Sequence, residues 1–521
     1  MPVPQTPLRF LRHAERIEPD KTAIVCGSVR LTFREYAHRV RQLTGALSGL
    51  GVGRGDRVAY LGLNCHRLLE LYYAVPACAA ILSPLNVRLT EPELLFILQD
   101  LEAKLLVTDR FLKPMAERLA AQFDVRVIYL GADDAPAGWL DYEELLAQAT
   151  PRDFLAEEID EQEVAEIFYT SGTTGRPKGV MLTHRNLHQH AMSVIASGPV
   201  YPDEVQLVGT VPLFHVNGWG SPQFLVAMAG TQVVTSRFDP EDFFRLVHQE
   251  RVTLAYLVPT MLAAILNSPL RSQYDLGSLR RITIGGAPPP SAMIREAHDE
   301  LGVDCSVGYG LSETCPVLSL AVIKETLKTA PEAEQYRLRA LTGLPILGAE
   351  LRVMGEEGEE VAHDGVSVGE IWARGDMISP GYWRRPEETA TVFVDGWFHT
   401  GDMAVVEPNG YLRIVDRKKD VIISGGENIS SVEVEDAIYT HPAVMEAAVV
   451  AKPHARWGEV PVAFVVLRPG AALQPEELRE HLRGRIANFK IPHEVRILPE
   501  LPKTGTGKVV KTSLRETAKQ A

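Results

Sequence analysis

The chain has 521 residues, several times the usual size of one domain, so about two to four folding units with ample core are expected. Its hydrophobic content of 45% and charged content of 23% are typical of globular proteins. The net charge of −14 argues against non-specific binding to nucleic acids or anionic membranes, because like charges repel. Any phosphate ligand must therefore be held by local groups.

The cysteines and the apolar stretches indicate a protein of the cytoplasm. The five cysteines are odd in number and contain no C-x-x-C pair, which favours reduced thiols over a disulfide framework or a zinc site. Residues 1–13 lack the apolar core of a signal peptide. The most apolar stretches, 71–87 and 224–234, are short or interrupted by proline and polar residues. They predict buried helices and strands rather than a transmembrane segment, and peripheral membrane contact is left open.

Up to about residue 320, strand-like and helical runs alternate. The strand-like runs are RVAYLG (57–62), KLLVTD (104–109), VRVIYLG (125–131), TQVVTS (231–236), TLAYLVP (253–259) and RRITIGG (280–286). The helical runs are PELLFILQD (92–100) and DFFRLVHQE (242–250). This alternation predicts α/β layers with parallel strands. No repeat is evident, which argues against a solenoid.

The composition changes after residue 340. Short alternating runs separated by Gly, Asp and Asn-Gly turns predict a small β-barrel-like subdomain from about 340 to 417, with a hairpin turn at Asn409-Gly410. The charged pentad DRKKD (416–420) follows, and we expect a domain boundary after residue 417. The remaining residues predict a compact α+β unit, with helices in 431–444 and 477–489 and strands at 447–451 and 461–467.

The loop YTSGTTGRPKG (169–179) is a candidate anion site. Its small residues leave backbone N–H groups and hydroxyls accessible, and anions bind such concavities. Lys178 adds a full positive charge. The plainer alternative is a turn between a strand AEIFYT (165–170) and a helix near HRNLHQH (184–190). The spacing is not that of a Walker A loop, and GTGKV (505–509) does not match one either.

Seven motifs, which span nearly the whole chain, follow one another in order. They are YTSGTTGRPKGVMLTH (169–184), GGAPPP (285–290), GYGLSETCP (308–316), GWFHTGD (396–402), DRKKDVIISGGENIS (416–430), FKIP (489–492) and PKTGTGK (502–508). They closely resemble the motifs of the adenylate-forming superfamily of acyl-CoA synthetases, peptide-synthetase adenylation domains and beetle luciferases. The resemblance implies a large N-terminal AMP-binding domain of α/β layers (1–417) and a small mobile α+β C-terminal domain (418–521).

The resemblance also implies a site for ATP. The implied residues are Thr170, Ser171, Gly172, Thr173, Thr174, Gly175, Lys178, Gly286, Ala287, Tyr309, Gly310, Ser312, Glu313, Asp402, Arg417 and Lys508. The adenine ring would lie against the backbone of residues 285–287 with Tyr309 stacked on it. Asp402, assisted by Arg417, would accept hydrogen bonds from the ribose hydroxyls. Glu313 would be a ligand of Mg²⁺, and the family's usual threonine is replaced by Ser312, which keeps the hydroxyl.

By resemblance, Lys508 is the main catalytic residue, with Glu313, Lys178 and His215 as further candidates. When a carboxylate attacks the α-phosphorus of ATP, negative charge builds on the phosphate oxygens, and a preorganised lysine stabilises it by about 3 to 4 kcal/mol. Lys508 lies in the small domain and ATP in the large one. The resemblance therefore implies that the small domain rotates about the hinge residue Lys419 after adenylation. The loop with Gly425 and Gly426 would then face the thiol of coenzyme A.

The segment VPLFHVNGWG (211–220) resembles a form common in synthetases for hydrophobic acids. By this resemblance His215 lies between the acid and thiol channels, and Asn217 and Trp219 contact the acid or CoA. No aspartate of the kind that holds an α-amino group is found at the expected place. We expect a small-molecule carboxylic acid, a medium- or long-chain fatty acid, with a short branched or aromatic acid as the alternative.

Three hypotheses stay open at this stage. The first is an acid–CoA ligase, an enzyme of the acid–thiol ligase class that uses ATP, Mg²⁺ and CoA. The second is an adenylation enzyme that loads a carrier protein, and the third is a non-catalytic nucleotide-binding protein. The intact Lys178, Glu313 and Lys508 argue against the third. No nucleic acid partner is expected, and a homodimer is an expectation from family analogy alone.

Overall fold

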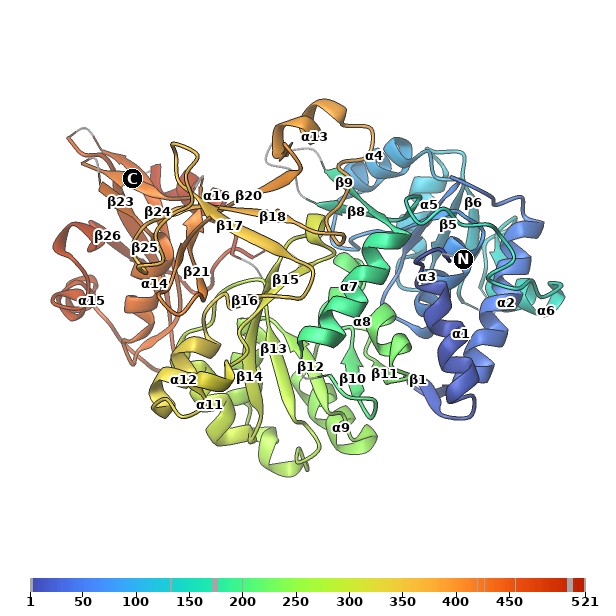
Figure 1. The fold of residues 1–521 in the computed structure, drawn as a ribbon, viewed down its shortest axis with the longest axis horizontal. Helices are drawn as coiled ribbons and strands as arrows, with labels where there is room; N and C mark the ends of the chain where they lie inside the picture. The colour runs from blue at the N-terminus through green and yellow to red at the C-terminus, as the bar shows by residue number, and fades with distance from the viewer. Residues whose placement is uncertain are drawn as a thin grey trace.

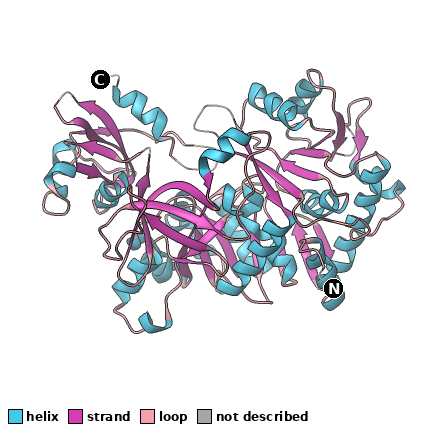
Figure 2. Cartoon of the chain, turned by 45° about the horizontal axis from the view of Figure 1, so that its top comes forward, coloured by secondary structure: helices cyan, strands magenta, loops and turns pink. Residues whose placement is uncertain are grey.

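The computed structural model describes most of the chain as a broad molecule with its N-terminus in the large part and its C-terminus in the small part (Figure 1). It describes residues 3–131, 134–170, 177–198, 200–418, 420–425, 427–454, 456–503 and 509–519. Four sheets carry the fold, and helices flank them (Figure 2).

The central sheet has nine strands in the order β16-β15-β14-β13-β12-β10-β11-β1-β2. The strands are β1 (Thr22–Cys26), β2 (Val29–Thr32), β10 (Val205–Val208), β11 (Thr231–Val234), β12 (Leu254–Leu257), β13 (Arg281–Ile284), β14 (Asp304–Gly310), β15 (Val317–Leu320) and β16 (Leu344–Pro345). The six middle strands, β14-β13-β12-β10-β11-β1, pair in parallel. At the two ends of the sheet, β2 pairs antiparallel with β1, and β15 and β16 continue antiparallel from β14. The predicted parallel α/β layers are confirmed.

A second sheet of seven strands has the order β7-β6-β5-β3-β4-β8-β9. The strands are β3 (Arg57–Leu61), β4 (Ile81–Pro84), β5 (Leu105–Thr108), β6 (Arg126–Tyr129), β7 (Leu140–Asp141), β8 (Val164–Thr170) and β9 (Lys178–Thr183). The pairing is parallel except for β8 with β9. The strand β9 was not predicted, because its sequence KGVMLT directly follows the glycine-rich loop and was assigned to the approach of a helix.

A third sheet of five strands forms where the turn-rich composition begins, with β21 pairing with β20 beside the path β17-β18-β20-β19. The strands are β17 (Glu350–Met354), β18 (Gly369–Arg374), β19 (Phe393–Val394), β20 (Trp397–Val406) and β21 (Leu412–Arg417). All pairs are antiparallel. Gly410 has a φ of 84° between β20 and β21, which fits the predicted turn at Asn409-Gly410.

The C-terminal sheet has five strands, with β26 pairing with β25 beside the path β23-β22-β25-β24. The strands are β22 (Ile422–Ser424), β23 (Glu427–Ile429), β24 (Val444–His454), β25 (Gly458–Leu467) and β26 (Glu494–Ile497). With its helices it forms the predicted small α+β domain. The helix predicted for 477–489 is shorter, since α15 ends at Leu482 and Gly484 takes a φ of 74° that a right-handed helix does not allow.

Helices cover the sheets on both sides in the large domain. Those before the glycine-rich loop are α1 (Leu8–Ile17), α2 (Phe33–Gly49), α3 (His66–Ala77), α4 (Glu91–Leu101), α5 (Lys113–Ala120) and α6 (Tyr142–Gln148). Those after it are α7 (His184–Ser197), α8 (Val216–Ala227), α9 (Pro240–Glu250), α10 (Pro259–Leu266), α11 (Ser291–Leu301), α12 (Glu332–Arg339) and α13 (Pro386–Val392). The C-terminal domain adds α14 (Ser431–Tyr439), α15 (Pro475–Leu482) and α16 (Lys511–Lys519).

The largest apolar core joins the first two sheets. It contains buried side chains of α2, α3, α7 and α8 together with strands of both sheets. A second core packs α9, α10 and α11 on the other face of the central sheet, and a third packs α4 and α5 on the seven-stranded sheet. Among the described residues, no helix combines the length and the apolar character needed to cross a bilayer. The five cysteines are free.

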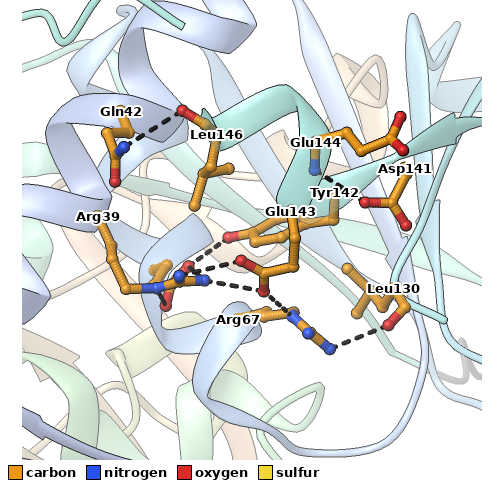
Figure 3. Close-up of polar contacts among 10 residues, drawn as sticks. Arg39, Gln42, Arg67, Leu130, Asp141, Tyr142, Glu143, Glu144 and Leu146 are labelled. Atoms are coloured by element: carbon orange, nitrogen blue, oxygen red, sulfur yellow. Dashed lines mark hydrogen bonds and ion pairs between the residues drawn. The ribbon is translucent and has the colours of Figure 1, made fainter. Parts of the chain in front are cut away.

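A buried ionic network fixes α2, α3 and α6 to one another (Figure 3). Arg39 donates to Glu70 at 2.7 Å and to Glu143 at 3.0 Å, and Arg67 donates to Glu143 at 2.7 Å. The Tyr142 hydroxyl donates to Glu70 at 2.5 Å. Glu70 is fully buried, so these partners supply the hydrogen bonds that its carboxylate would lose to desolvation.

Candidate functional site

One large cavity, of about 2130 Å³, runs along β12, β13 and β14 from their first residues, Leu254, Arg281 and Asp304, to the segments beyond their carboxyl ends. It also reaches the C-terminal domain. Most of the predicted site residues line it. They are Thr170, Lys178, His215, Trp219, Gly286, Ala287, Tyr309, Gly310, Ser312, Glu313, Asp402 and Arg417. Glu435, Val509 and Lys511 of the small domain line the same cavity. Ligands of parallel α/β sheets bind beyond the carboxyl ends of the strands, so the position suits a nucleotide site.

Some predicted site residues lie outside the described residues. They are Ser171, Gly172, Thr173, Thr174, Gly175, Lys419, Gly426 and Lys508. Their described neighbours are informative, because Pro177 and Lys178 on one side, and Val509 and Val510 on the other, line the cavity. The segments that flank the glycine-rich loop and the C-terminal PKTGTGK motif therefore face one space.

Asp402 is held between two donors. It lies on β20 with an exposed fraction of 3%. The Tyr309 hydroxyl donates to Asp402 Oδ2 at 2.8 Å, and Arg417 Nε lies 2.6 Å from Oδ1. The register of β20 and β21 places Asp402 directly opposite Arg417. Burial, followed by the nearby carboxylate, raises the pKa of Tyr309 well above its usual value, so its hydroxyl stays a donor.

A second group forms around Tyr382. Its hydroxyl donates to Glu313 Oε1 at 2.8 Å. Burial raises the pKa of Glu313, while the bond from Tyr382 and the charge of Arg417 lower it in part. Lys178 forms an ion pair with Glu388 on α13, and its ammonium lies 5.4 Å from the centre of the Tyr382 ring. The predicted carboxylate and the predicted cation are thus joined by one aromatic side chain.

Two glycines of the motifs are required by close approach. A Cβ atom on Gly310 would lie 1.6 Å from the carbonyl oxygen of Pro316, and one on Gly285 would lie 2.5 Å from Cη2 of Trp219. Such separations are far below van der Waals contact, so neither site accepts a side chain. The flat ring that lies against Gly285 in this structure is the indole of Trp219.

The segment that carries His215 and Trp219 turns the wrong way for an α-helix. From Val216 to Gly220 every φ is positive, between 42° and 85°. His215 and Trp219 line the cavity, but Asn217, which was predicted to contact the acid or CoA, is fully buried and does not. Its amide donates to Glu166 Oε2 at 3.0 Å instead. The left-handed turn directs these neighbours to opposite sides, which a motif cannot show.

Glu166 on β8 makes stability depend on pH. Burial raises its pKa to about 8, although hydrogen bonds from Asn217 and Gln223 oppose the shift. Between about pH 4.5 and pH 8 the folded chain therefore holds a proton that the unfolded chain releases, so the free energy of unfolding falls as pH rises. We expect the free energy of unfolding of the intact chain, relative to that of Glu166→Gln, to decrease from pH 5 to pH 8 with a slope of up to about 1.4 kcal/mol per pH unit, measured by denaturant titration at each pH. A difference that stays constant over this range would contradict the assigned shift.

Gly425 lies in the turn between β22 and β23. It has a φ of 62°, its N–H donates to the carbonyl of Trp457 at 2.7 Å, and a Cβ atom would lie 3.0 Å from Cε3 of Trp457. The structure does not bring it to the cavity wall. Its predicted contact with CoA therefore depends on a second arrangement of the small domain, which stays a prediction.

Charged groups anchor the small domain where α16 begins. Lys511 Nζ lies 2.8 Å from Glu435 Oε1 and also donates to the Ser431 hydroxyl. Asp416 at the end of β21 accepts the N–H of Ser431 at 2.8 Å. Burial lowers the pKa of Lys511, but the charges of Glu435 and Asp416 outweigh it and the net shift is upward. These contacts fix the segment that follows Lys508.

Tyr382 and Glu388 were not found from the sequence. Tyr382 and Glu313 are 69 residues apart. Tyr382 stands in a GYW turn without any pattern that indicates a ligand, and Glu388 resembles any acidic residue in the first turn of a helix. Only the packing of α13 over the cavity reveals their role.

Comparison with protein families supports the motif assignment. The model of the AMP-binding enzyme family matches residues 10–383, and the model of the AMP-binding enzyme C-terminal domain matches residues 433–508. The chain belongs to the AMP-binding enzyme family. The predicted membership of the adenylate-forming superfamily is thereby confirmed.

Relatives of this AMP-binding enzyme cover almost all of it. It is 40% identical to a long-chain-fatty-acid–CoA ligase of Thermus thermophilus, over 94% of this chain and 90% of that one. It is 40% identical to a feruloyl-CoA synthase of an Amycolatopsis species, over 96% of both. The crystal structure of the anthranilate CoA ligase AuaEII with anthranoyl-AMP superposes with a TM-score of 0.90 at 25% identity, covering 100% of this chain and 98% of that one. The predicted class of enzyme, an acid–thiol ligase, is confirmed.

Proposed function

We propose that this AMP-binding enzyme is an ATP-dependent acid–CoA ligase for a hydrophobic carboxylic acid. It forms an acyl-AMP with release of pyrophosphate and then transfers the acyl group to the thiol of CoA. The observation that carries the proposal is the single cavity shared by the Asp402–Arg417 pair, Glu313 and the Trp219 wall, with the small domain at its side. Its relatives are named for CoA thioesters of fatty and aromatic acids.

In the first half-reaction each group would have one task. The Asp402 carboxylate would accept the ribose hydroxyls while Arg417 and Tyr309 hold it in place. Lys178 would exchange Glu388 for phosphate oxygens, which replace the carboxylate as an anionic partner of the ammonium group. Lys508 would stabilise the charge that builds as the acid attacks the α-phosphorus. The alternation of the small domain about Lys419, and the domain boundary after residue 417, are part of this proposal.

Glu313 fits the role of a magnesium ligand. The described residues contain no cluster of three or more His, Cys, Asp or Glu side chains that could form a metal cage. Magnesium is commonly held by one or two carboxylates together with substrate phosphates, so a single well-placed carboxylate is sufficient. When bound, Mg²⁺ neutralises charge on the triphosphate. Tyr382 keeps the Glu313 carboxylate oriented toward the cavity.

The acid side of the cavity is apolar. Leu254, Tyr256 and Val258 alternate on one face of the β12 segment and line the cavity, and Val216 and Trp219 face the same space. Each buried methylene of an acid would gain about 0.8 kcal/mol on such a surface. We favour a medium- or long-chain fatty acid, and fatty acid metabolism as its setting. The alternative is a short branched or aromatic acid, supported by the feruloyl and anthranilate relatives.

An ATP–pyrophosphate exchange assay over a panel of acids tests the proposal. We expect exchange with hydrophobic acids and not with amino acids, because the sequence has no aspartate at the place where the resemblance puts the group that holds an α-amino group. Adding CoA should then release AMP and form the thioester. Exchange without any thioester would favour the second candidate, an adenylation enzyme that loads a carrier protein. No exchange with any acid would contradict the ligase.

Two further expectations belong to the proposal. A cytoplasmic location is supported by the free cysteines. A homodimer stays an expectation from family analogy. The partners that the cavity can accommodate are small molecules, namely ATP, the acid and CoA.

A further inference from the structure

A carboxyl group buried behind the acid pocket accepts hydrogen bonds from two neutral amides. Glu166 on β8 has an exposed fraction of 0%. Asn217 Nδ2 donates to its Oε2 at 3.0 Å, and Gln223 Nε2 donates to its Oε1 at 2.9 Å. No ion pair reaches Glu166 from the described residues, in contrast to Glu70, which has Arg39. An apolar residue would be buried here at a lower desolvation cost, so stability alone does not explain why a glutamate occupies this position.

Both amides belong to the segment that enters α8 through the left-handed turn Val216–Gly220. A left-handed conformation costs roughly 1–2 kcal/mol for each residue with a side chain, and Val216 at a φ of 42° is branched at Cβ. Strain of this kind persists only where surrounding contacts hold it. The turn therefore needs anchors outside its own backbone.

Asn217 connects the carboxylate to the turn. Its Nδ2 donates to Glu166, and its Oδ1 accepts the N–H of Gly220 at 2.7 Å. Gln223 also donates to Glu166, three residues after Gly220, where α8 has become right-handed. The carboxylate thus joins the two ends of the irregular segment. It provides two acceptors at one point, which no apolar side chain could do.

The result of this anchoring is the position of Trp219. Its ring packs where a Cβ atom of Gly285 would lie and stands 5.6 Å from the ring of Tyr256. Gly220 leaves room for His190, whose Cε1 would lie 2.7 Å from a Cβ atom there. Trp219 lines the cavity. A small rotation of the turn would change the width of the acid pocket.

We propose that Glu166 is a positioning residue for the acid substrate: through Asn217 and Gln223 it holds the left-handed turn that presents Trp219 to the acid. The inference rests on the proposed function, in which Trp219 forms a wall of the acid pocket. Glu166 itself does not touch the cavity and takes no part in proton or acyl transfer. Its effect is on the recognition of the acid and not on that of ATP.

The substitution Asn217→Asp tests the contact. The new carboxylate still accepts the Gly220 N–H. Burial raises the pKa of Glu166 to about 8, so at neutral pH its protonated carboxyl group can donate to the new carboxylate. The KM values are therefore measured above about pH 9, where the two carboxylates face each other acceptor to acceptor. We expect the KM for a hydrophobic acid to rise about tenfold, as for the loss of a buried hydrogen bond to a charged group, with the KM for ATP changed less than about twofold. In the double variant Glu166→Gln/Asn217→Asp, amide and carboxylate exchange places and every hydrogen bond of the network is available again. The KM for the acid should then return to within about twofold of the original value.

The matched control is Glu70→Gln. Glu70 is equally buried in the same domain but contacts Arg39 and Tyr142, away from the cavity. This variant should lower the thermal midpoint and leave the KM for the acid unchanged. If Asn217→Asp also lowers only the midpoint, or if the double variant does not restore the KM, Glu166 has a purely structural role and the inference is wrong.

A spectroscopic measurement separates this inference from the proposed function. Asn217→Asp should shift the tryptophan emission of the intact chain, and the shift should disappear in a Trp219→Phe background. This result does not require any acid to be a substrate. If the enzyme activates no acid of the panel, the proposed function fails, but the emission measurement still tests whether Glu166 positions Trp219. A shift that persists without Trp219 would overturn that positioning.

Discussion

Replacing Lys508 with alanine is expected to slow acyl-AMP formation by about 10²- to 10³-fold, the typical effect of removing one preorganised group that stabilises transition-state charge. The physical reason is that acid and triphosphate are both anions, so their approach needs a cation between them. Val509 and Val510 line the cavity, and Lys511 is anchored three residues beyond Lys508. The segment is therefore held at the place where the cation is needed.

The two half-reactions separate this role from a general loss of structure. Thioester formation from presynthesised acyl-AMP and CoA should be changed less than about threefold by Lys508→Ala, because the proposed rotation of the small domain removes Lys508 from the phosphate before that step. Lys503→Ala is the matched control, since Lys503 belongs to the same motif but pairs with Glu446 at 2.6 Å. It should leave both steps nearly unchanged. An equal loss in both half-reactions of Lys508→Ala would show that the assigned role is wrong.

The sequence predicted the site residues that belong to short motifs. Asp402, Glu313 and Arg417 each look like ordinary polar residues alone, and only the order of the motifs along the chain marked them as one site. The structure brings all three to one cavity. Strand register explains part of this, because Asp402 and Arg417 face each other across β20 and β21.

What the sequence could not predict depends on distant packing. Tyr382 reaches Glu313 from 69 residues away, and Glu166 reaches Asn217 from 51 residues away. No local sequence pattern indicates either pair, because the packing of β8, α8 and the segment before α13 brings the partners together. Asn217 shows the same limit: a motif gives the neighbours of a residue but not the left-handed turn that directs its side chain to Glu166 in this structure. Its contact with the acid or CoA stays a prediction.

Local propensity also failed at two element boundaries. The segment 178–183 forms β9 because β8 offers an antiparallel edge to pair with, a long-range cause that its own sequence does not carry. The helix predicted for 477–489 stops at Leu482, because Arg483 already has an extended backbone, with a ψ of 133°.

Asp402→Ala is expected to raise the KM for ATP by about 10²-fold, because two charge-assisted hydrogen bonds to the ribose would be lost at about 1.5 to 3 kcal/mol each before compensation by water. Asp402 is nearly fully buried, so its removal also leaves the Arg417 guanidinium and the Tyr309 hydroxyl without the acceptor that they contact here. The control is Asp364→Ala, which removes an exposed aspartate that caps a turn by accepting the N–H of Val366 at 2.8 Å. That variant should keep the KM for ATP.

A nucleotide lacking one hydroxyl decides whether Asp402 binds ribose or only supports Arg417. The intact enzyme should use 2′-deoxy-ATP with a KM about tenfold higher than that for ATP, since one hydrogen bond to the carboxylate is missing. In Asp402→Ala the two nucleotides should have equal KM values, because the group that distinguishes them is gone. A variant that still prefers ATP by the original factor would place the ribose elsewhere in the cavity. Arg417 would then be the only one of the pair left as a candidate for direct contact with the nucleotide.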